Sequence, residues 1–138
     1  MTTQLNTTAA SNDSTAILDQ AHDGLKRTIY AFVRTDLSPE QQMVQAAHAA
    51  AEAGRRFYRP EHGISSLIVL AVSNLQALYK AKMLLERLDI EHDMFFEPDW
   101  NTGHSAIGTR PLLDSERPLL KGYQLWKLKA ARTEGVAA

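Results

Sequence analysis

The segment of residues 64–97 constrains the fold most. Its first part, residues 64–72, is a near-continuous apolar and β-branched run, which predicts a strand buried on both faces. Ser73 follows as an N-cap, and a helix with one apolar and one charged stripe is expected from there to about Leu88. Residues 90–97 then form a returning strand. This order predicts a parallel strand pair with a right-handed helical crossover, and therefore an α/β fold.

Another strand and helix are expected before this segment. Residues 28–34 are β-branched and aromatic, as is typical of a strand. Ser38 stands directly before Pro39, an N-cap followed by a proline in the first helical turn, so a helix is expected over residues 39–53. Gly54 is expected to end it. Alanines crowd the second half of this helix, so it can pack very close to a sheet.

The rest of the chain fits the same single domain. Pro, Asp, Asn and Gly mark a turn at residues 98–103, and a short strand is expected over residues 104–109. A turn of helix follows at residues 115–120, and an extended stretch at residues 123–128. The domain is therefore expected to span residues 28–128.

Both ends of the chain lack the pattern of a packed element. Residues 1–14 are rich in Thr, Ser and Asn without apolar periodicity, which predicts a disordered polar tail. Residues 15–27 have roughly helical apolar spacing and are expected to form a short helix. Residues 129–138 are expected to be a frayed C-terminus.

Composition excludes several functional classes. The 138 residues include no cysteine, which excludes a disulfide framework, thiol catalysis and thiolate metal sites and favours a cytoplasmic protein. The longest apolar run is far shorter than the roughly 20 residues of a membrane span, so no membrane association is expected. The formal net charge is −1, which does not suggest a protein that coats nucleic acid. The charge is uneven, because residues 86–99 hold six acids and one arginine, whereas residues 110–138 are basic.

One stripe of polar side chains lies on the first expected helix. Gln41, Gln45, His48 and Glu52 follow one another at intervals of four, three and four, so all four share one helix face. Such a stripe is most simply a solvated face.

Polar residues also follow the expected strands. Because sites in parallel sheets form beyond the carboxyl ends of the strands, these residues are expected to gather at one edge. They are Arg34, Thr35 and Asp36 after the first strand, Ser73 and Asn74 after the second, and Glu97, Asp99 and Trp100 after the third.

Two stretches resemble the type II peptidyl-tRNA hydrolases. Residues 30–50 read YAFVRTDLSPEQQMVQAAHAA, which is similar to the family's opening strand, V-R-x-D-L loop and Gln-x-x-His-Ala helix. Residues 95–109 resemble the family's aspartate loop, which ends in Gly-Thr ten residues after the aspartate, as Asp99 and Thr109 do here. The resemblance covers about residues 28–110.

The resemblance implies a fold and a reaction. The fold would be a three-layer α/β/α arrangement with a small, mixed, mostly parallel four-stranded sheet. The reaction would be hydrolysis of the ester between a peptide and the acceptor end of tRNA, without metal or cofactor. Asp99 would orient or activate water, and Thr109 would donate to the substrate or oxyanion. Substrate-binding positions would be Arg34, Asp36, Gln41, Gln45, His48, Thr102 and His104.

The chain departs from the family at charged positions. Pro39 and Gln41 stand where the family has lysines, with Glu40 between them, and the family's second loop threonine falls on Gly103, next to Thr102. Hydrolysis is therefore expected to be weak or lost. The alternative is a non-catalytic binding or regulatory module, with a protein partner, a second copy of the chain or a small ligand at the cleft between Asp36 and Asp99 or at a sheet edge. The resemblance predicts a mixed sheet with the Arg34 and Asp99 loops at the same edge.

Overall fold

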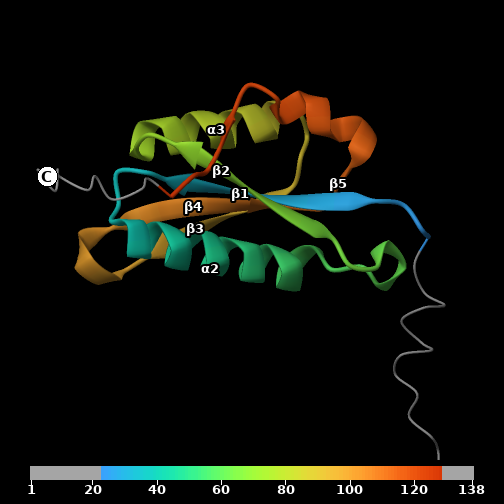
Figure 1. The fold of residues 1–138 in the computed structure, drawn as a ribbon, viewed down its shortest axis with the longest axis horizontal. Helices are drawn as coiled ribbons and strands as arrows, with labels where there is room; N and C mark the ends of the chain where they lie inside the picture. Colours follow the sequence, from blue (N-terminus) through green and yellow to red (C-terminus); the bar gives the residue numbers. More distant parts are fainter. Residues whose placement is uncertain (1–22, 129–138) are drawn as a thin grey trace, which may run out of the picture.

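The protein has an α/β fold, seen in a computed structural model that describes residues 23–128 (Figure 1). The predicted tail, residues 1–14, and the predicted frayed C-terminus, residues 129–138, lie outside the described residues. Of the helix predicted over residues 15–27, only the last five positions are described, and Arg27 begins the first strand. In chain order the elements are β1 (Arg27–Arg34), α2 (Pro39–Phe57), η1 (Pro60–His62), β2 (Ser66–Val72), α3 (Leu75–Arg87), β3 (His92–Glu97), η2 (Asp99–Asn101), β4 (Gly103–Thr109), β5 (Leu112–Leu113), η3 (Asp114–Leu120) and β6 (Gln124–Leu125).

The sheet is mixed and has the order β3-β4-β1-β2-β6, with β5 also paired to β1. Two points of the sequence prediction need correction. The sheet has four long strands and two strands of two residues, rather than four in total. Only β1 and β2 pair in parallel, because β4 lies antiparallel between β1 and β3 and so separates β3 from β2. The predicted parallel pairing of β2 with β3 is therefore wrong.

β1 is more deeply buried than β2. Tyr30, Ala31, Phe32 and Val33 are at most 5% exposed, whereas in β2 only Leu70 and Val72 are fully buried. β1 has long partners on both sides, while the outer side of β2 pairs only with the short β6. The prediction that residues 64–72 are buried on both faces is therefore wrong for their first half.

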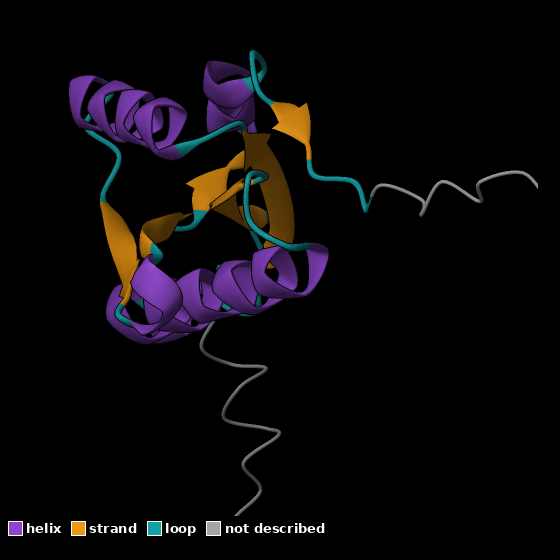
Figure 2. Cartoon of the chain, turned by 90° about the vertical axis from the view of Figure 1, so that its left-hand side faces the viewer, coloured by secondary structure: helices purple, strands orange, loops and turns teal. Residues whose placement is uncertain are grey.

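Helices cover both faces of the sheet, as Figures 1 and 2 show. On the α3 side, the core contains Phe32, Leu78, Leu85 and Ile107. On the α2 side it is built from smaller residues, including Val33, Ala46, Ala49 and Ala106. Within residues 23–128 we find no helix with the length and apolarity needed to cross a membrane.

The expected close approach of α2 to the sheet is confirmed. A Cβ atom added at Gly108 in β4 would lie 2.4 Å from the carbonyl oxygen of Ala49 and 2.7 Å from the Cβ atom of Ala53. Glycine, which has no Cβ atom, is therefore the residue that fits where α2 packs on β4.

Local signals predicted the start of α2 and, to within one residue, the end of α3, but not the end of α2 or the cap of α3. The Ser38 hydroxyl caps α2 by accepting from the Gln41 backbone N–H at 3.3 Å, as predicted. The predicted end at Gly54 is wrong, because α2 continues to Phe57, whose side chain is buried. The cap of α3 is Asn74 rather than Ser73, since the Asn74 side chain accepts from the Ala77 N–H at 2.9 Å.

Candidate functional site

The first candidate site lies where β1 and β3 end and β4 begins. We call it the Arg34 edge and define it by Arg34, Asp36, Glu97, Asp99 and the start of β4, with the first turns of α2 above them. β1 and β3 both run antiparallel to β4, so their carboxyl ends meet its amino end. The Arg34 and Asp99 loops therefore share one edge, as expected from the sequence.

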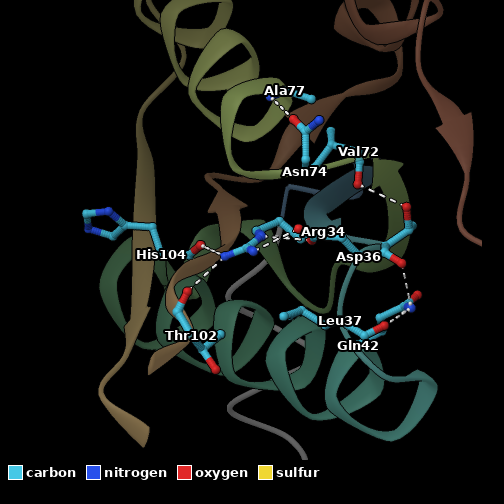
Figure 3. A network of polar contacts seen from close by, with 10 residues as sticks. Arg34, Asp36, Leu37, Gln42, Val72, Asn74, Ala77, Thr102 and His104 are labelled. Carbon is cyan, nitrogen blue, oxygen red and sulfur yellow. Dashed lines mark hydrogen bonds and ion pairs between the residues drawn. The ribbon is translucent and has the colours of Figure 1, made fainter. Parts of the chain in front are cut away.

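Arg34 is the centre of a closed network (Figure 3). Its Nε and Nη2 atoms donate to the two carboxylate oxygens of Asp36, both at 2.9 Å. Its Nη1 donates to the carbonyl oxygens of Thr102 at 2.8 Å and His104 at 3.0 Å. The Arg34 side chain is 12% exposed. Arg34 thus clamps the β3–β4 loop to the β1 loop, and Asp36 balances its charge.

A second set of contacts holds the β1 loop from the helix side. Gln42 Nε2 donates to the carbonyl oxygens of Leu37 at 2.6 Å and Thr35 at 3.2 Å, part of which Figure 3 shows. Gln42 Oε1 accepts from the indole N–H of Trp126 at 2.8 Å. In the sequence, only the place of Gln42 just after the Ser38 cap suggests this role.

The polar stripe of α2, formed by Gln41, Gln45, His48 and Glu52, is not simply a solvated face. Gln45 is fully buried, and its Nε2 donates to Glu97 Oε2 at 3.0 Å and to Gln41 Oε1 at 3.2 Å. Its Oε1 accepts from the hydroxyl of buried Ser105 at 2.6 Å. Sequence reasoning missed the roles of Glu97 and Ser105; strand alternation places Glu97 on the face that carries Phe95, toward α2.

Glu97 remains ionised in this network. The hydrogen bond from Gln45, followed by the one from the backbone N–H of Asp99 at 3.0 Å, holds the pKa of the Glu97 carboxyl below its ordinary value. The side chain is only 8% exposed. The Arg34 edge therefore contains a fixed and partly buried negative charge.

The two histidines predicted for the site lie on opposite faces of the sheet. His48 is on α2, and its ring stacks on Phe95 with centroids 4.7 Å apart and planes 5° apart. His104 faces α3, where its Nδ1 lies 2.9 Å from the Tyr79 hydroxyl and its ring meets Phe96 edge-on. The structure does not bring these two histidines together.

The structure also separates Asp99 from Thr109. Asp99 is exposed at the start of η2, before β4, and Thr109 ends β4. The seven residues of this strand place its ends about 20 Å apart. Thr109 is fully buried, accepts from the backbone N–H of Tyr30 at 3.0 Å and donates to the carbonyl oxygen of Arg110 at 2.8 Å. The threonine at the Asp99 end is Thr102.

The charges at the Arg34 edge are mainly negative. Arg34 is set against the three carboxylates of Asp36, Glu97 and Asp99, and Gln41 is neutral. Such an edge disfavours a polyphosphate backbone and favours a cationic group. Among residues 23–128 we find no group of three or more histidine or carboxylate side chains placed to hold a metal ion.

No family model matches this chain, and no curated protein matches it.

Proposed function

We propose that this chain is a non-catalytic binding module with the three-layer fold of the type II peptidyl-tRNA hydrolases, and that its Arg34 edge binds a cationic segment of a partner protein. The closed Arg34 network is the observation that carries this proposal. Its guanidinium already donates to Asp36 and to two carbonyl oxygens, so its charge is not free for a phosphate. Glu97 and Asp99 add further negative charge.

Exposed apolar side chains beside these charges support a protein partner. Phe96 is 55% exposed, Trp100 is 76% exposed, and Met43 on α2 is 62% exposed. Trp100 has φ 54°, a left-handed conformation unusual for a bulky residue. Aromatic residues and methionine are enriched in protein interfaces. We therefore propose a partner segment that combines lysine or arginine with an apolar side chain.

We propose a different protein rather than symmetric pairing of this edge with the same edge of a second copy, because that pairing would bring like charges together. The cytoplasm is the location we propose, since a chain without cysteine suits a reducing compartment.

A peptide titration tests the binding module. A short peptide of alternating lysine and leucine is added to the full chain, and the indole signal of Trp100 is followed by NMR. We expect saturable binding that weakens as salt is raised. Asp99→Asn should reduce the affinity about threefold, whereas Asp114→Asn, an exposed acid on η3, should not. Equal affinities for the two variants, or no saturable shift, would contradict the proposal.

The second candidate function is hydrolysis of peptidyl-tRNA. It is favoured by one observation: Asp99 and Thr102 lie at the same edge as Arg34. Asp99 would orient water, and the Thr102 hydroxyl would donate in the place that the resemblance gives to Thr109.

The assay is release of peptide from peptidyl-tRNA at low salt, with Asp99→Ala and Thr102→Ala as variants. Turnover above background that both variants lose would establish hydrolysis and overturn the binding module. We expect no turnover above background.

A further inference from the structure

Two adjoining cavities lie at the opposite end of the sheet from the Arg34 edge. The first, of about 260 Å³, is lined by Arg27, Arg59, Arg110 and two glutamates. The second, of about 270 Å³, is lined mainly by apolar residues, including Ile29 and Ile64. The two cavities share the side chains of Phe57, Arg59, His62 and Pro111. A charged cavity therefore adjoins an apolar cavity.

Arg59 is the guanidinium of the charged cavity that has no carboxylate partner within residues 23–128. The lining of this cavity contains three guanidinium groups and the carboxylates of Glu91 and Glu116. Arg27 is held by both oxygens of Asp23 at 2.8 Å, and Arg110 by both oxygens of Glu116 at 2.7 and 3.1 Å. Arg59 makes no ion pair within residues 23–128, and its Nη1 donates to the carbonyl oxygen of Tyr58 at 3.0 Å. Its remaining donors are open to an anion.

His62 lines both cavities and carries an unsatisfied polar atom. Its Nδ1 is buried and has no hydrogen-bond partner within the described part of the chain. Buried polar atoms in folded proteins are nearly always paired, so an unpaired one in a residue that lines both cavities points to a missing partner.

The apolar cavity is bordered by unusually exposed apolar side chains. Ile64 is fully exposed and Tyr58 is 55% exposed, and both line this cavity. A ligand tail laid along Ile29, Ala53 and Ile64 would remove this surface from water.

We propose that the two cavities together bind an amphipathic carboxylate: a monoanionic head at Arg59 and His62, and an apolar tail along Ile29 and Ile64. The one guanidinium without an ion pair, that of Arg59, matches a single carboxylate, and its planar fork suits the two carboxylate oxygens. The adjoining apolar cavity favours a ligand with an apolar tail over a free inorganic anion. The site is independent of the Arg34 edge, because it lies at the other end of β1 and shares no residue with that edge.

Octanoate is the probe that tests this site, titrated into the full chain and followed by calorimetry and by NMR of backbone amides. We expect saturable binding, with shifts centred on the cavity linings. Octanol has the same tail without the charge, and inorganic phosphate has charge without the tail; each should bind at least about tenfold more weakly than octanoate.

Two arginine variants supply the matched comparison. Arg59→Gln removes the unpaired guanidinium from an exposed side chain and should lower the octanoate affinity about tenfold. Arg55→Gln lies near the same end of α2, is paired with Glu52 at 2.7 Å and lines neither cavity, so it should leave the affinity unchanged. Ile64→Ser should weaken octanoate without changing stability, since Ile64 is exposed.

Four results would overturn the proposal. They are the absence of saturable binding at millimolar octanoate, equal affinity for octanol, equal affinity for phosphate, and equal octanoate affinity of the Arg59→Gln and Arg55→Gln variants.

Discussion

Replacing Gly108 with alanine tests how closely α2 packs on β4. The new Cβ atom would lie 2.4 Å from the Ala49 carbonyl oxygen, whereas ordinary contact begins at 3.4 Å. Because this neighbour is backbone, relief requires α2 to move about 1 Å from the sheet, which loosens the cluster of Val33, Ala46 and Ala49. Overpacking of a dense core costs about 1–3 kcal/mol, and a backbone clash belongs at the upper end. We therefore expect the free energy of unfolding to fall by about 3 kcal/mol.

Urea denaturation followed by circular dichroism measures this free energy. Gly54→Ala is the matched control, since Gly54 lies inside α2 and an added Cβ atom would meet no heavy atom within 4 Å. The control should be unchanged or more stable by about 0.5–1 kcal/mol, because alanine favours helix. A Gly108→Ala protein whose stability lies within about 0.5 kcal/mol of the parent would refute the close packing of α2 on β4.

Three further perturbations test the polar contacts. Gln45→Leu removes the donor to Glu97 and the acceptor of Ser105, so denaturation in urea should show a loss of about 3 kcal/mol. Folding lowers the pKa of Glu97, so ionised Glu97 stabilises the folded state at pH above its ordinary pKa of 4.5. This stabilisation is lost as the pH falls through the pKa of the folded state. In the Glu97→Gln variant the free energy of unfolding should therefore depend less on pH between pH 6 and 3. Asn74→Ala removes the α3 cap and should cost about 1 kcal/mol in thermal unfolding, whereas Ser73→Ala should cost little.

The fold was predictable where the signal is local. The Ser38 cap is a short-range contact, and the alternation of strands and helices gave the α/β class. The end of α2 was not predictable, because the burial of Phe57 and the ion pair of Arg56 with Asp93 at 2.7 Å extend the helix past Gly54. The position of β4 between β3 and β1 could not be predicted from the sequence either, since strand order depends on contacts between distant segments.

The candidate site, too, was predictable where it depends on local signals and not where it depends on distant residues. The gathering of Arg34 and Asp99 at one edge follows from where strands end, and the sequence predicted it. The burial of Gln45 depends on Glu97 and Ser105, which lie 52 and 60 residues later. Helical spacing alone cannot distinguish such a residue from a solvated one.

The central place of β1 in the sheet has a consequence for synthesis on the ribosome. β1 emerges before every other strand of the sheet, yet its backbone at Tyr30 bonds to Thr109, 79 residues later. At about 5–20 residues per second, this strand waits about 4–16 s for that partner. During that interval a strongly apolar strand has one side unpaired, so a nascent chain stalled before β4 should be a substrate for chaperones.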